Sequence, residues 1–294
     1  MPAGFESTWT TCSRRDTVVT SAHLRFWRRP ELCEPRLVVG WNTDAGRLGA
    51  RVTEYLIERL GGEDFCEIEP TEFYPLVGVS VEDDVAQFPE GRFYCCAEKN
   101  LVVFKGDAPS FGWYGYLDAM LDVGEACHVR ELYTIGGMVF PGAHTVPREL
   151  LAVSNCAQLK ETLGGYHLSR GGDYVTPSGR RPTINSYLLW VAKRRNLPGL
   201  NVWVPIPFYL LGVEDPRAER RVLHFLNEKL DLGVDLRDVE EDTRRQYQAI
   251  AEMRTRFPDI DDSIRRLETN LTLTEEQSQR LVEEIERYLK QERR

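Results

Sequence analysis

The sequence predicts an α/β fold: a mostly parallel central sheet with helices on both faces, followed by a C-terminal helical extension. Short apolar runs recur through residues 36–236, and amphipathic helical segments separate them. Because a parallel strand pair needs a long crossover connection, strands that alternate with helices are expected to pair in parallel. Densely charged sequence begins after residue 236. We therefore expect an α/β domain at residues 1–236 and a helical extension at residues 237–294.

The first strand-and-helix unit is predicted at residues 36–62, RLVVGWNTDAGRLGARVTEYLIERLGG. Its apolar run LVVGW has the length of a buried strand. Five residues then recur at the spacing of one helix face: Leu48, Val52, Tyr55, Leu56 and Leu60. Gly61-Gly62 is expected to end this helix, because glycine adopts positive φ without strain.

Further apolar runs predict the other strands. Residues 22–27 are expected to form an edge strand, and residues 92–110 two strands around a Glu-Lys-Asn turn. The run ELYTIGGMV is expected to leave its strand at Gly136-Gly137, and ELLAVSN forms another strand. The run LNVWVPIPFYL contains two prolines, which predicts an edge strand or a strand end because proline cannot donate to the ladder.

Two more helices are predicted at residues 115–127 and 185–196, and a third begins near Asp215, a good N-cap followed by Pro216. In the extension, a sparse stripe consists of Tyr247, Ile250, Ala251 and Phe257. A capping box at residues 274–277 opens the last helix. One face of that helix is apolar: Leu281, Val282, Ile285, Tyr288 and Leu289. These stripes are too narrow to fold alone, so the extension must dock on the core or on another chain.

The composition argues against several classes of protein. The net charge of −9 disfavours contact with nucleic acid. Seven cysteines without a CxxC pair argue against a secreted disulfide framework and a zinc ribbon. Vicinal Cys95-Cys96 is either a redox pair or, as we favour, a pair of buried strand thiols. We find no signal peptide and no membrane span, and therefore expect a cytoplasmic protein.

The glycine-bearing loop of the first unit has the general form of a phosphate cradle. Gly40, Gly46 and Gly49 miss the G-x-G-x-x-G spacing, and GRLGA lacks the lysine and hydroxyl of a P-loop. The free N–H groups of the helix start are still able to bind an anion. We favour the alternative, in which Gly46 and Gly49 permit a tight turn and close helix-strand packing.

Other candidates for chemistry are isolated residues. Asp107 follows a predicted strand, where ligands of open α/β sheets bind, but it also suits a turn or helix cap. Gly136-Gly137 is either an anion nest or a turn. His144 is the histidine most suited to a loop role, and Arg180-Arg181 lies in a loop that either recognises an anion or is simply solvated. The histidine spacing predicts no metal site, no G-x-S-x-G elbow is present, and we expect no cofactor.

The succession of these segments resembles the PAC2 family, that of proteasome assembly chaperone 2 and its archaeal and bacterial relatives. The resemblance runs from about residue 30 to 236 through LVVGWNTDAGRLGARVTEYLIERLGG, LVVFKGDAPS, ELYTIGGM, GRRPTINSYLLWVAKRRNLPGLNVWVPIPFYL and DPRAERRVLHFLNEKLDLGVDL. It implies a fold related to the phosphorylase/hydrolase architecture and a homo-oligomer, with a trimer as one stoichiometry. Some relatives dock on proteasome rings by a C-terminal hydrophobic-Tyr-any tripeptide, which the ending YLKQERR lacks.

Two functions of different class follow. The first is a non-enzymatic assembly chaperone or scaffold that contacts itself and the subunits of an assembly. The second is an enzyme or small-anion binder acting on a nucleoside-type ligand, with Asp107 as base, Gly46, Gly49, Gly136 and Gly137 as weak anion-site candidates, and His144 or Arg180 as accessories. We favour the first, because the resemblance carries no catalytic set and function argued from fold alone is weakly founded.

Overall fold

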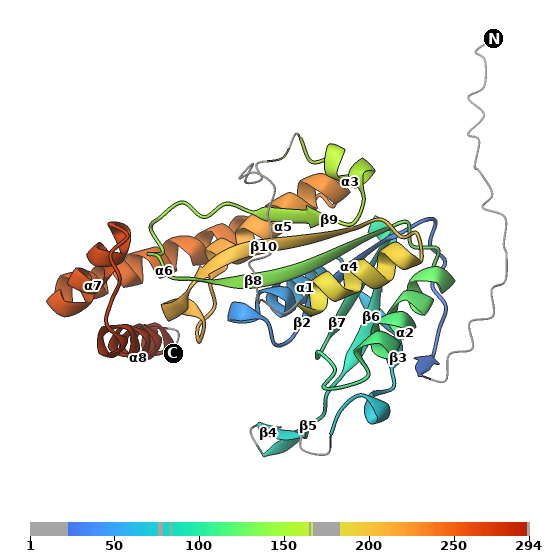
Figure 1. Cartoon of the computed structure of the whole chain (residues 1–294), viewed down its shortest axis with the longest axis horizontal. Helices are drawn as coiled ribbons and strands as arrows, with labels where there is room; N and C mark the ends of the chain where they lie inside the picture. The colour runs from blue at the N-terminus through green and yellow to red at the C-terminus, as the bar shows by residue number, and fades with distance from the viewer. Residues whose placement is uncertain (1–22, 76–78, 83, 165, 167–182, 293–294) are drawn as a thin grey trace, which may run out of the picture.

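The computed structural model describes residues 23–75, 79–82, 84–164, 166 and 183–292. Within this part of the chain, eight strands form one sheet in the order β1-β3-β6-β7-β2-β8-β10-β9, and a β4-β5 hairpin projects from the body (Figure 1). The strands are β1 (Leu24–Phe26), β2 (Arg36–Trp41), β3 (Glu63–Ile68), β4 (Ser80–Glu82), β5 (Val85–Gln87), β6 (Gly91–Cys96), β7 (Leu101–Gly106), β8 (Glu131–Phe140), β9 (Leu151–Ser154) and β10 (Gly199–Pro207).

The sheet is parallel at its centre and antiparallel at both sides. Strands β7, β2, β8 and β10 pair in parallel, and β1, β3 and β6 continue the sheet as antiparallel neighbours on one side. Strand β9 joins the other side antiparallel to β10. The α/β class is therefore confirmed with a mixed sheet, because β6 and β7 are joined by a tight turn that permits only antiparallel pairing.

Helices cover both faces of the sheet. Helix α1 (Leu48–Arg59) and helix α5 (Pro216–Leu230) pack on one face, and α2 (Trp113–Ala126) and α4 (Ile184–Arg194) pack on the other. Short α3 (Ala157–Glu161) follows β9. The apolar stripe predicted for α1 is buried, and Gly61 has the positive φ expected after this helix.

Strand β10 shows how its prolines are tolerated. Strand β9 pairs only with the segment Leu200–Trp203, so the end of β10 that contains Pro205 and Pro207 has β8 as its one partner strand in the described sheet. Pro205 and Pro207, which lack an N–H donor, therefore lie in the part of β10 that is an edge of the sheet.

Strand β8 differs from its prediction. It continues through Gly136 and Gly137 to Phe140 instead of ending at the glycine pair. A Cβ atom on Gly137 would lie 2.0 Å from the carbonyl oxygen of Ala45. Gly137 therefore permits the loop after β2 to lie against β8. The hydrophobic periodicity of the sequence does not reveal this contact.

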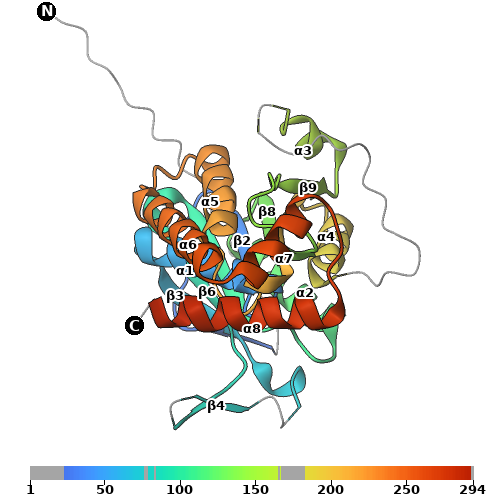
Figure 2. The same ribbon diagram turned by 90° about the vertical axis from the view of Figure 1, so that its left-hand side faces the viewer.

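The last three helices pack against the main body. Helices α6 (Arg237–Arg256), α7 (Pro258–Glu268) and α8 (Glu275–Glu292) lie at one end of the molecule, with α8 crossing that end (Figure 2). Leu281, Ile285 and Leu289 are buried in the same apolar cluster as the residues of α1 and β10. The stripe predicted for α8 is thus confirmed. In the sparse stripe of α6, Ala251 and the following cap residue Phe257 are exposed, and Met253 is the buried residue.

The capping predictions hold at both helix starts. Thr274 Oγ1 accepts a hydrogen bond from the Gln277 N–H, and Gln277 Oε1 accepts one from the Thr274 N–H. Asp215 caps α5 by accepting from the Ala218 N–H. Cys95 and Cys96 are buried in β6, as expected of strand thiols. Across the described residues, no helix combines the length and the apolar character needed to cross a bilayer.

Candidate functional site

The two predicted glycine segments meet at the carboxylate of Asp44. This residue lies between β2 and a short 3-10 turn (Ala45–Arg47) that leads into α1. Its Oδ2 atom accepts hydrogen bonds from the Gly137 N–H at 2.8 Å and the Gly49 N–H at 3.1 Å. Burial raises the pKa of Asp44 to about 6. The N–H groups of Gly49 and Gly137, which were candidates for an anion site, therefore already donate to the Asp44 carboxylate. An external anion has to compete with this side chain.

The glycines also have the packing role that we favoured. Gly46 has φ of 67°, and a Cβ atom there would lie 2.8 Å from Cδ1 of Ile206. A Cβ atom on Gly49 would lie 2.8 Å from the backbone nitrogen of Trp41. Gly136 faces Asn185, whose amide donates to the Ile135 carbonyl and accepts from the Trp41 indole. These glycines thus permit a tight turn and a close contact between helix and strand.

Asp107 serves a turn next to β7. Its N–H donates to the Glu90 carbonyl at 2.7 Å, and its side chain accepts from the Glu90 N–H at 3.1 Å. Its carbonyl accepts from the Tyr74 hydroxyl at 2.6 Å. These contacts are those of the turn residue given as its alternative role; the cap of α2 is Gly112 instead.

His144 is buried beside two tyrosines in the loop after β8. Its Nδ1 atom lies 2.8 Å from the Tyr209 hydroxyl, and its carbonyl accepts from Tyr247 and Arg217. Burial, and then the charge of nearby Arg148, lower the pKa of His144 to about 4. The imidazole is therefore neutral at pH 7. Among the described residues His144 and Asp107 share no hydrogen-bond partner, so the structure does not assemble them into one acid-base set.

A buried ion pair beneath α5 was missed by the sequence analysis. Arg148 and Asp215 have side chains only 2% and 1% exposed and form a bidentate contact. The cap role of Asp215 was visible in the sequence, but its partner lies 67 residues away. Breaking such a pair leaves an uncompensated buried charge, so it fixes the loop of Arg148 against α5.

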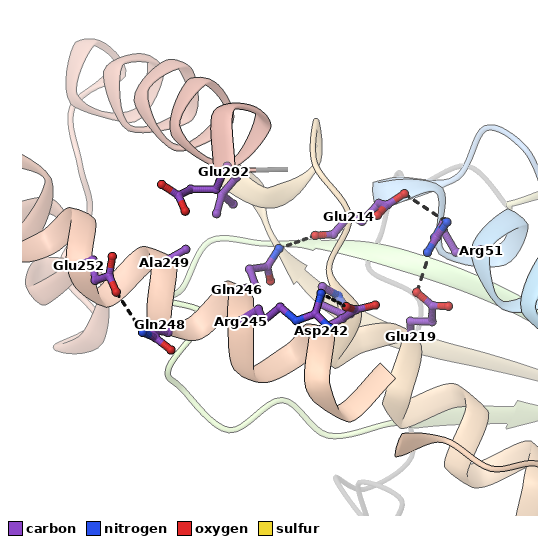
Figure 3. Close-up of a pocket in the computed structure, with 12 residues that line it drawn as sticks. Arg51, Glu214, Glu219, Asp242, Arg245, Gln246, Gln248, Ala249, Glu252 and Glu292 are labelled. Atoms are coloured by element: carbon purple, nitrogen blue, oxygen red, sulfur yellow. Dashed lines mark hydrogen bonds and ion pairs between the residues drawn. The ribbon is translucent and has the colours of Figure 1, made fainter. Parts of the chain in front are cut away.

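An acidic cavity lies between α1, α5, α6 and α8 and has a volume of about 620 Å³ (Figure 3). Arg51 of α1 stands between two carboxylates, with Nη1 3.2 Å from Glu214 and Nε 3.6 Å from Glu219. Gln246 of α6 donates to the Glu214 carbonyl at 2.5 Å. The acidic residues of this cleft outnumber its two arginines, Arg51 and Arg245: Glu214, Glu219, Asp242, Glu252 and Glu292.

Glu219 is the group of this cleft whose ionisation is most altered. It is 4% exposed, and burial raises its pKa to about 7 although Arg51 acts in the opposite direction. The described lining residues include no hydroxyl, thiol or imidazole group, so the cleft offers no such nucleophile. Its charge suits a cationic side chain or an amine. Arg180 and Arg181 lie outside the described residues, and within those residues no group of three His, Cys, Asp or Glu is placed to hold a metal ion.

Solved structures share this fold at low sequence identity. An unknown-function protein of Mycobacterium tuberculosis has 17% identity and a TM-score of 0.72, over 88% of this chain and 91% of that one. A proteasome-assembly chaperone homologue of the same organism has 20% identity and a TM-score of 0.63, over 74% and 94%. PbaB of Pyrococcus furiosus, an archaeal proteasome activator, has 21% identity and a TM-score of 0.63, over 78% and 97%.

The sequence itself decides the family. No curated protein matches the chain significantly. The model of the PAC2 family matches residues 37–254, from β2 into α6, and so includes the sheet except for β1, both helical layers and the start of the extension. The chain belongs to the PAC2 family.

Proposed function

We propose that this PAC2-family protein acts in the cytoplasm through protein contacts, as an assembly chaperone or scaffold that also associates with itself. The observation that carries this proposal is the family match over residues 37–254. Relatives of the same fold include a proteasome-assembly chaperone homologue and a proteasome activator, which supports protein partners for this chain. The odd number of cysteines supports a reducing compartment.

An exposed aromatic surface on α2 and α4 is the best candidate for such a contact. Trp190 of α4 is 45% exposed and stacks on Tyr187, with ring centroids 5.3 Å apart. Tyr114 of α2 is 44% exposed and meets Trp190 edge to face at 6.2 Å. Exposed tryptophan and tyrosine are the residues that most often carry binding energy at protein interfaces.

A second copy of this chain is the occupant we propose for the α2/α4 aromatic surface. Arg194 lies over the Trp190 ring at 5.2 Å, so one helix carries a cation beside the aromatic centre. The neighbouring helix carries Asp118 and Asp122, which are held by Arg195. A surface with cations on one helix and carboxylates on the other is complementary to itself, which closed oligomers require.

Size-exclusion chromatography with light scattering tests self-association. The wild-type chain is expected to elute as an oligomer at micromolar concentration, and Trp190→Glu is expected to elute as a monomer. Phe88→Glu, at an aromatic residue 67% exposed near the β4-β5 hairpin, is the matched control and retains the oligomer. A monomeric wild-type protein contradicts self-association.

Partners of the chaperone role need a separate measurement. Affinity capture from the native host, followed by mass spectrometry, is expected to enrich subunits of one large assembly. Free subunits should be enriched relative to the finished assembly, because an assembly chaperone binds its clients before completion. Capture of the finished assembly alone, or of no assembly subunit, contradicts chaperoning.

A further inference from the structure

We propose that a groove along the outer face of α5 binds the phosphate group of a small molecule. Arg217, Arg220, Arg221 and His224 follow the i, i+3, i+4, i+7 spacing and therefore share one face of the helix. Together with Arg148 from the loop before β9 they define the α5 arginine groove. This face is distinct from the one that carries Glu219 into the acidic cleft.

The groove is a cavity with walls from three segments. Its volume is about 470 Å³, and the wall opposite α5 is formed by residues 147–150 and Tyr166. A second cavity of about 530 Å³ shares Arg217 and Arg220 and extends the groove toward α6. These volumes lie within the range of sites for small molecules.

The lining of the groove contains more basic than acidic side chains, although the chain as a whole is acidic. Four arginines and one histidine line the first cavity against two carboxylates, Glu149 and Glu228, in a chain of net charge −9. Arg217 donates to the neutral acceptors His144 and Tyr247, and Arg221 forms no ion pair with any residue that the structure describes. Two guanidinium groups of the groove, those of Arg217 and Arg221, therefore take part in no ion pair within the described chain.

Three arginines of the groove carry buried donors without an acceptor. The Nε atoms of Arg148, Arg220 and Arg221 are buried and make no hydrogen bond in the described structure. Arg148 is 5% exposed, and its other nitrogens bind Asp215 and the Pro205 carbonyl. Arg220 Nε lies 3.4 Å from Glu240, close enough for an ion pair but without the direction of a hydrogen bond. A buried donor destabilises a protein unless water or a ligand accepts its hydrogen bond, so these three atoms are donors that an anionic ligand in the groove would satisfy.

The chemistry of this set favours phosphate. The planar fork of a guanidinium matches two oxygens of a phosphate or carboxylate. Arginines at i, i+3 and i+4 line the same cavity, and a phosphate ester brings nearly two charges and three acceptor oxygens to such a set. Beside them, Phe225 and Tyr166 meet edge to face at 5.4 Å and give an apolar wall for an attached organic group.

Calorimetric titration of the full-length protein tests the site. The probes are inorganic phosphate, adenosine 5′-monophosphate and, as the uncharged control, adenosine. Arg221→Gln removes a guanidinium that has no described ion-pair partner, and Arg220→Gln provides a second variant should the first fail to fold. Arg25→Gln, in the edge strand β1 with a side chain 74% exposed, is the matched control.

We expect saturable binding of a phosphate probe and none of adenosine. The dissociation constant is expected to rise at least about tenfold in Arg221→Gln, as the loss of a charged hydrogen bond implies, and to be unchanged in Arg25→Gln. Tighter binding of the nucleotide than of phosphate identifies an ester as the ligand, and equal binding identifies free phosphate. Absence of saturable binding of both phosphate probes at millimolar concentration overturns the proposal, as does equal affinity of the folded Arg221→Gln variant.

Discussion

The carboxylate of Asp44 accepts a hydrogen bond of 2.8 Å from the backbone N–H of Gly137, a residue 93 positions further along the chain. The same oxygen accepts from the Gly49 N–H at the start of α1. One half-buried side chain thus joins the loop after β2, the first helix and the middle of β8. The Asp44 carboxylate thus occupies the place at the N-terminus of α1 where an external anion would otherwise bind.

Replacing Asp44 by alanine is expected to destabilise the protein. The substitution leaves two backbone N–H groups without their acceptor, and each such group costs about 1–3 kcal/mol when buried. We expect a loss of about 2 kcal/mol or more in the free energy of unfolding, measured by urea titration at pH 7.5. The exposed Asp262→Ala on α7 is the control, with an expected change below about 0.5 kcal/mol. Equal stability of the two variants would show that the Asp44 contacts contribute little.

Glu219 is expected to make stability fall with rising pH. Its pKa is about 7 in the folded protein, against an ordinary value of 4.5 in the unfolded chain. The folded state therefore holds an extra proton between these values, and that contribution is complete below pH 4.5 and lost as the pH rises through 7. Relative to the wild type, Glu219→Gln should gain roughly 2–3 kcal/mol between pH 5 and pH 8. A pH-independent difference in unfolding free energy would contradict the raised pKa.

His144 is expected to make the stability of the protein fall as the pH falls, the opposite of the effect of Glu219. Its pKa is about 4 in the folded protein, against an ordinary value of 6.5 in the unfolded chain. Its contribution to stability is therefore complete above pH 6.5 and is lost as the pH falls through 4. Between pH 7.5 and pH 4.5 the wild type should lose roughly 2–3 kcal/mol relative to His144→Asn, whose amide does not titrate. Chemical unfolding at several pH values measures this difference. Direct titration by NMR gives a second check, in which a pKa near 6.5 would contradict the prediction.

The C-terminal helices are expected to unfold together with the sheet. Ile285 of α8 is fully buried in the cluster that includes β10, so Ile285→Ala should cost about 2–5 kcal/mol. The exposed Glu283→Ala on the same helix is the control and should change stability little. Circular dichroism and tryptophan fluorescence should report one coincident transition in urea. Two separate transitions would show that α8 is an independent unit.

The local features of the fold could be predicted from sequence because their causes lie within a few residues. The stripe of α1, the cap of α5 by Asp215 and the capping box at Thr274 depend on helical period and on hydrogen bonds over three residues. The position of Pro205 and Pro207 at a sheet margin follows from the missing N–H group alone.

The contacts between distant segments were decided by the tertiary structure. Gly137 remains inside β8 because the loop of Ala45 packs against it, and Phe257 is exposed because Met253 meets the core instead. The pairing of Arg148 with Asp215 and the convergence of Arg51 with Glu219 likewise join segments far apart in the chain. The sequence by itself determined the alternation of strands and helices, the helix caps and the family. Only the folded chain decided which polar groups meet, because burial and pairing depend on surfaces that local periodicity does not bring together.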